Sequence, residues 1–83
     1  MDPSDVSHLL STAFPGAEIE VTDFTGTGDH FRARIVSQRF RGLGPLDQHK
    51  LVYAALAEPM KGAIHALSLE THTPESWARR QAR

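Results

Sequence analysis

The sequence predicts a single α+β domain over residues 1–83, a three-stranded mixed sheet with helices on one face. Helical spacing of apolar residues and strand-like alternation succeed each other as helix, strand, strand, helix, short helix, strand, helix. About 25 residues, including helices, separate the second strand from the third, too long for a hairpin but typical of a parallel crossover.

A stripe of apolar residues at i, i+3, i+4, i+7 and i+8 predicts the first helix: Val6, Leu9, Leu10, Ala13 and Phe14. Asp2 is suited to cap this helix, and Pro3 to occupy its first position. Pro15-Gly16 should end it.

Two alternating segments predict an antiparallel pair of strands. Each has one apolar face, formed by Ala17, Ile19 and Val21 in the first and by Phe31, Ala33 and Ile35 in the second. Arg32 and Arg34 point away from the apolar face of the second strand. Residues 25–29 form the glycine-containing loop between the strands.

The second half of the chain predicts the crossover and the third strand. Four residues share a face of the central helix, with Val52 beside them: Leu46, His49, Tyr53 and Leu56. Pro59 should start a short helix that Gly62 stops, and residues 64–71 return to a strand. Thr73-Pro74 provides a cap and a first-turn proline for a last helix that carries Trp77.

Composition restricts the classes of function. Nine Lys and Arg against ten Asp and Glu give a net charge of −1, so no overall attraction to nucleic acid or anionic membranes is expected. Arg79, Arg80 and Arg83 make the C-terminus locally basic, which is typical of a solvated tail. No apolar stretch approaches the ~20 residues of a membrane span, and the N-terminus has no targeting pattern, so we expect a cytoplasmic protein.

Five histidines stand out because a chain without cysteine must bind a metal through imidazole or carboxylate. A parallel crossover places the starts of the second and third strands at one end of the sheet. His30, His65 and the loop 25–29 should therefore meet there. The alternation of the two strands places them on different faces, since His30 lies on the face opposite the core and His65 lies on the core face of its strand. Metal ligation thus requires an irregularity that turns one residue toward the other.

Each histidine also has a structural interpretation. His65 is otherwise a hydrogen-bonded residue at a strand end, and His30 a solvent-facing strand residue. His49 is expected to pack against the core or bond within its helix. His8 and His72 are expected at the surface.

Six segments resemble the BolA family in order and spacing and cover nearly the whole chain: Gly26–Phe31, Ile35–Ser37, Phe40–Gly42, Gln48–Tyr53, Ile64–Leu69 and Thr73–Trp77. The resemblance implies an αββαβ fold akin to the class II KH fold. It also implies an accessory role in iron–sulfur trafficking or iron sensing, in which a 2Fe-2S cluster is shared with a monothiol glutaredoxin. The isolated chain is then expected to carry no cofactor and to be a monomer or a weak homodimer.

The family pattern maps one histidine ligand onto His65 and the second onto His30, as in the subgroup with a histidine in the loop. The glutaredoxin cysteine and glutathione would supply the sulfur ligands. Asp29 either orients an imidazole or has a simple turn role. Gly26 and Gly28 are too closely spaced for a dinucleotide fingerprint and are expected to make the loop flexible.

Two alternatives remain open, and neither is an enzyme, since no catalytic constellation is evident in the sequence. Four basic residues offer a local patch for nucleic acid, in a KH-like fold whose Gly42-Leu43-Gly44 is one residue short of GXXG: Arg39, Arg41, Lys50 and Lys61. DNA binding of this kind should depend strongly on salt. The other alternative is an adaptor that binds glutaredoxin without a metal.

Overall fold

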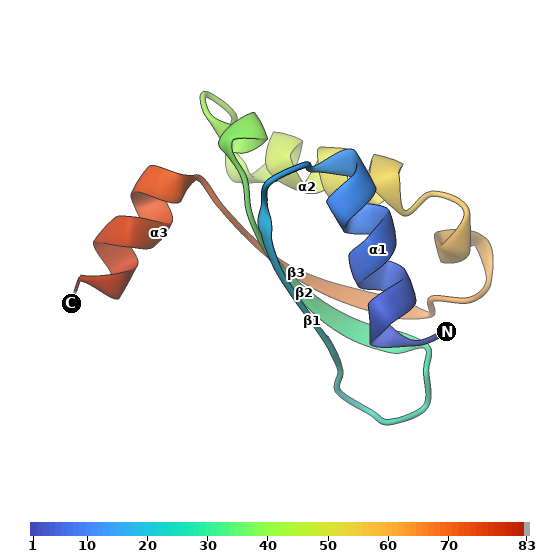
Figure 1. Cartoon of the computed structure of the whole chain (residues 1–83). Coiled ribbons are helices and arrows are strands. Elements are labelled where there is room, and N and C mark those ends of the chain that lie inside the picture. The colour runs from blue at the N-terminus through green and yellow to red at the C-terminus, as the bar shows by residue number, and fades with distance from the viewer. Residues whose placement is uncertain (83) are drawn as a thin grey trace.

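A computed structural model describes residues 1–82 (Figure 1). The six main elements follow the predicted order: α1 (Pro3–Ala13), β1 (Glu18–Asp23), β2 (His30–Val36), α2 (Pro45–Ala55), β3 (Ala66–His72) and α3 (Pro74–Gln81). Two 3₁₀ turns, Gln38–Phe40 and Pro59–Lys61, flank α2, and the second is the short helix predicted to start at Pro59.

The three strands form one mixed sheet in the order β1-β2-β3. β1 runs antiparallel to β2, with Thr22 opposite Arg32. β3 runs parallel to β2, with Ala66 beside His30. The mixed sheet and its parallel crossover are therefore confirmed.

Helices α1 and α2 cover one face of the sheet (Figure 1). The buried side chains between these layers come from α1, β2, α2 and the segments that adjoin them. They are Val6, Leu10, Phe14, Phe31, Ala33, Ile35, Phe40, Val52, Leu56 and Ile64. The rings of Phe14 and Phe40 lie 5.3 Å apart, so the turn after β2 packs directly on α1. This small core fixes the sheet whose edge carries the histidines.

The predicted apolar face of α2 is wrong at Leu46 and Tyr53 and correct at Leu56. Leu46 is 69% exposed and Tyr53 42% exposed, whereas Val52 and Leu56 are buried. Gln48 lies one turn before Val52, and its amide donates to the Leu43 carbonyl at 2.9 Å and accepts from the Thr71 hydroxyl at 2.7 Å. The observed rotation of α2 thus combines burial of Val52 and Leu56 with these two hydrogen bonds. His49, on the neighbouring face, is only half-buried.

Local signals define the helix starts as predicted. Asp2 is the N-cap of α1, with Pro3 in the first turn, and the Asp5 carboxylate accepts from the Asp2 N–H at 2.9 Å. Thr73 caps α3 by accepting from the Ser76 N–H at 3.1 Å. Both caps satisfy N–H groups that a helix start leaves without intrahelical partners.

Helix α3 lies beyond the end of the sheet, apart from the α1 and α2 layer (Figure 1). Its Trp77 contacts the opposite sheet face, 4.9 Å from the His72 ring and 4.6 Å from the Arg34 guanidinium. His72 is therefore 14% exposed in its side chain, and its expected surface position is wrong. The predicted basic tail is partly helical, since Arg80 lies in α3; Arg83 lies outside the described residues.

None of the helices within residues 1–82 has the length and apolar character needed to cross a membrane.

Candidate functional site

His30 and His65 lie together at one edge of the sheet. Their rings stack with centroids 6.1 Å apart and planes inclined by 19°. His30 is the first residue of β2, and His65 immediately precedes β3, where its N–H donates to the Asp29 carbonyl at 2.7 Å. Because His65 stands outside the regular strand, the alternation of β3 does not direct its side chain. The conflict of parity is thereby resolved.

Asp29 both positions the strand entry and orients an imidazole. Its carbonyl accepts from the N–H groups of His65 and Ala66, and its carboxylate lies 2.7 Å from Nδ1 of His30. Hydrogen bonds from the Thr27 hydroxyl and from His30 hold the pKa of the Asp29 carboxyl below its ordinary value. A carboxylate on Nδ1 favours the tautomer in which Nε2 carries the free lone pair.

Two glycines with positive φ and two hydrogen bonds to one carboxylate define the conformation of the glycine loop. Gly26 and Gly28 have φ of 76° and 77°, in the left-handed region that glycine adopts without strain. The Asp23 carboxylate accepts from the Gly26 N–H at 3.0 Å and from the Gly28 N–H at 2.8 Å. Asp23 is not among the site residues predicted from the sequence. An Asp at the start of a turn rich in Thr and Gly is the signal for this bond pattern.

The separation of the two imidazole rings is close to the one that two ligands of a single metal ion would have. Metal–imidazole bonds are about 2 Å long, so two rings on one tetrahedral ion have centroids about 5 Å apart. The two ring centroids would have to approach each other by only about 1 Å to reach this separation. Both residues are accessible. Within residues 1–82, no group of three or more His, Cys, Asp or Glu could hold a metal alone. Two donors suffice for one iron of a 2Fe-2S cluster whose other ligands come from a partner.

Three of the four basic residues suggested for nucleic acid contact other groups of the chain. Arg41 forms a bidentate pair with Glu75, at 2.9 Å from Nε and 2.5 Å from Nη2. Lys61 pairs with Glu58 at 3.1 Å. The Arg39 guanidinium stacks over Phe14 and bonds to the Ala13 carbonyl, whereas Lys50 is exposed on α2.

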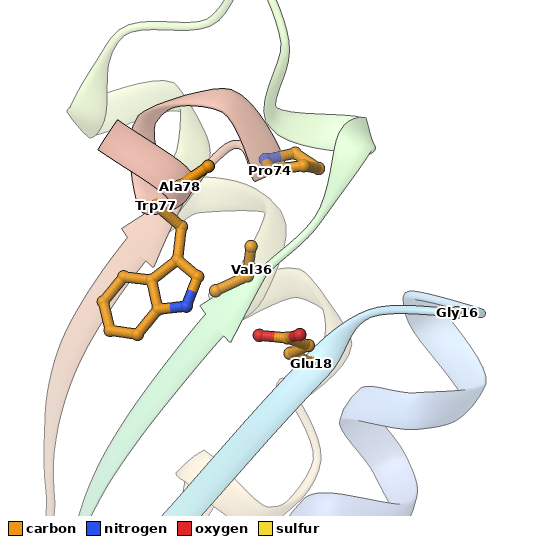
Figure 2. Close-up of a pocket in the computed structure, with 6 residues that line it drawn as sticks. All are labelled: Gly16, Glu18, Val36, Pro74, Trp77 and Ala78. Atoms are coloured by element: carbon orange, nitrogen blue, oxygen red, sulfur yellow. The ribbon is translucent and has the colours of Figure 1, made fainter. Parts of the chain in front are cut away.

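A separate groove of about 320 Å³ lies at the other end of the sheet, under α3 (Figure 2). Six residues line it: Gly16, Glu18, Val36, Pro74, Trp77 and Ala78. Val36 ends β2 and His30 begins it, so the groove is not part of the two-histidine site.

The fold and this edge define a small α+β module, in the order αββαβα, that presents two accessible imidazoles. A comparison with known families places it more narrowly. The chain belongs to the BolA-like protein family, which matches residues 4–76.

Two curated relatives and one solved structure illustrate the likeness. BolA-like protein 1 of Homo sapiens is 52% identical over 52 residues, which are 63% of this chain and 38% of that protein. The DNA-binding transcriptional regulator BolA of Escherichia coli is 34% identical over 79 residues, covering 87% of this chain and 75% of that protein. A crystal structure of a BolA-like protein from Babesia bovis superposes with a TM-score of 0.88 at 35% identity, over 98% of this chain and 94% of the other.

The matched segment thus spans 38% of the length of the human relative. The name of the Escherichia coli relative describes that protein as a DNA-binding transcriptional regulator, and the name of the human relative gives only the family.

Proposed function

We propose that the chain is a cytoplasmic accessory protein of iron–sulfur trafficking or iron sensing, which shares a 2Fe-2S cluster with a monothiol glutaredoxin. The observation that carries the proposal is the stacked, accessible pair His30 and His65 at the sheet edge. A site with two donors is incomplete by itself, which favours a ligand set divided between two proteins.

The residues of the edge have separate roles in this proposal. His65 offers an imidazole from a position fixed by the backbone bond to Asp29. His30 offers Nε2, because the Asp29 carboxylate occupies Nδ1. A 2Fe-2S cluster supplies one-electron chemistry, and imidazole ligands raise its reduction potential relative to thiolates.

The proposal is tested by mixing the purified chain with a monothiol glutaredoxin, glutathione, iron and sulfide, and recording visible absorption and circular dichroism. We expect a spectrum distinct from that of the glutaredoxin-only cluster. His65→Ala should return the spectrum to the glutaredoxin-only form, and His30→Ala should change it more mildly. His8→Ala is the matched control, since His8 is exposed on α1. A wild-type spectrum in His65→Ala would refute ligation by His65.

Nucleic-acid binding is the second candidate, favoured by the name of the Escherichia coli relative, a DNA-binding transcriptional regulator. Phosphate contacts make such binding fall steeply with salt. Binding of duplex DNA at low salt, weakened by Arg39→Gln or Lys50→Gln, would support this candidate. Absence of binding at low salt would remove it.

A metal-independent adaptor is distinguished by the requirement for the cluster. If the complex with glutaredoxin forms equally well without iron and sulfide, the histidine pair is not what joins the two proteins.

A further inference from the structure

The sheet face opposite the core carries its side chains in rows that cross all three strands. In the row nearer to α3, Arg34 on β2 lies between Glu20 on β1 and Glu70 on β3, so its positive charge is balanced by carboxylates. Arg34 pairs with Glu20 at 3.1 Å, and Glu70 lies 3.7 Å from Arg80 and 3.3 Å from His72. Both carboxylates of this row are thus already engaged.

The next row toward the histidines is not compensated. Arg32 stands between Thr22 and Ser68, two hydroxyl side chains that neutralise no charge. Arg32 is exposed, and within the described residues 1–82 no carboxylate lies at ion-pair distance from it. The row therefore presents one positive charge flanked by two hydroxyl groups.

Phe24 connects this row to the two-histidine site. Phe24 is 47% exposed. The Arg32 guanidinium lies 5.8 Å from the ring centroid on one side, and the His30 ring makes an edge contact at 6.1 Å. The Phe24 N–H also donates to the His30 carbonyl at 3.3 Å, so cation, aromatic ring and imidazole form one continuous surface.

A shallow hollow accompanies the free cation. It measures about 230 Å³ and is lined by Glu20, Thr22, Arg32, Arg34 and Glu70. This volume is below the roughly 300–1,000 Å³ of typical small-molecule sites. An open hollow of this size beside an exposed ring fits one side chain projecting from a protein surface.

We propose that Arg32 and Phe24 dock the protein partner of the two-histidine site by receiving an Asp or Glu side chain of that partner. The inference rests on the proposed function, because the adjacent edge is where that partner would bring its ligands. A guanidinium binds a carboxylate through two parallel hydrogen bonds, which fixes orientation as well as attraction. Thr22 lines the same hollow and offers a hydroxyl donor, and Phe24 offers apolar contact next to Arg32.

The test measures the dissociation constant between the purified chain and a purified, cluster-loaded monothiol glutaredoxin at low and at high salt. Arg32→Gln should weaken binding by about fivefold to tenfold and flatten its salt dependence, since the change removes one charge pair. Arg32→Lys keeps the charge but lacks the planar guanidinium, so its dissociation constant should lie between those of the wild type and Arg32→Gln. Lys50→Gln is the control with the same charge change on α2, and it should alter binding less than about twofold.

The visible spectrum of the saturated complex separates docking from ligation. Arg32→Gln should leave that spectrum unchanged, because both imidazoles remain. Wild-type affinity in Arg32→Gln, together with a spectrum that still depends on His65, would overturn the docking inference and leave the proposed function intact. If the wild-type chain forms no cluster-bridged complex, the proposed function fails and the docking inference fails with it. Glutathione without glutaredoxin is the last comparison. If it shifts the NMR signals of Thr22, Arg32 and Ser68 as the glutaredoxin does, the hollow binds the carboxylates of glutathione, and the proposal that it receives a side chain of the partner protein is refuted.

Discussion

Asp23 is the residue on which the geometry of the glycine loop most depends. Its carboxylate accepts two backbone hydrogen bonds, from Gly26 at 3.0 Å and from Gly28 at 2.8 Å. Hydrogen bonds to charged groups contribute about 1.5–3 kcal/mol each, and the exposed Gly26 N–H can regain water, which reduces its share. We expect Asp23→Ala to lower the free energy of unfolding by about 2 kcal/mol, measured by urea denaturation.

Asp23→Asn is the matched control for this prediction. The amide keeps one uncharged acceptor and the shape of the side chain, so the loss should be about half as large. The loop also carries Asp29 and leads into His30, so the alanine variant should lose a reconstituted cluster faster than wild type. An alanine variant as stable as wild type would show that the carboxylate does not hold the loop.

Three further outcomes follow from the fold and the ion pairs. Val52→Ala should lower the free energy of unfolding, measured by urea denaturation, by about 2 kcal/mol because Val52 is buried, and Tyr53→Ala by under about 0.5 kcal/mol. Equal losses in the two variants would contradict the observed rotation of α2. The hydrogen bond from Arg41 lowers the pKa of the Glu75 carboxyl below its ordinary 4.5, so the stability it contributes is present above that value and is lost as the pH falls below it. The urea midpoint of the wild type should therefore drop more between about pH 5 and pH 3 than that of Glu75→Gln, and parallel curves would show that the pair does not stabilise the fold. Thr73→Ala should destabilise the chain by about 1 kcal/mol through loss of the α3 cap, and restoration by Thr73→Ser but not by Thr73→Val would identify the hydroxyl as the cause.

The order of elements and the helix starts could be predicted from the sequence because their signals are local. Alternation in the strands and the caps at Asp2 and Thr73 depend on residues close together in the chain. The length of the crossover was enough to predict that His30 and His65 lie at the same end of the sheet. The topology of a parallel connection determines which strand ends are neighbours.

Features that depend on contacts between distant residues could not be predicted. The rotation of α2 goes with hydrogen bonds of Gln48 to Leu43 and Thr71 that form only on folding, whereas apolar periodicity alone placed the exposed Leu46 and Tyr53 on the core side. The burial of His72 depends on where α3 brings Trp77.

The stacking of the two histidine rings was unpredictable for a related reason. It requires His65 to lie just outside β3, and a boundary shift of one residue reverses the expected side. The uncompensated charge of Arg32 likewise emerges only from the register, which places Thr22 and Ser68, and no carboxylate, beside it.

The most direct test of the central claim is detection of this chain's own nitrogen atoms on the iron. The chain is labelled with ¹⁵N-histidine, combined with unlabelled glutaredoxin, glutathione, iron and sulfide, reduced, and measured by pulsed electron paramagnetic resonance. We predict hyperfine couplings from two ¹⁵N nuclei in the wild type, from one in His30→Ala, and from none in His65→Ala, whose cluster should return to the glutaredoxin-only form. A reduced cluster in the complex without any ¹⁵N coupling would contradict the assignment of the histidine pair as ligands.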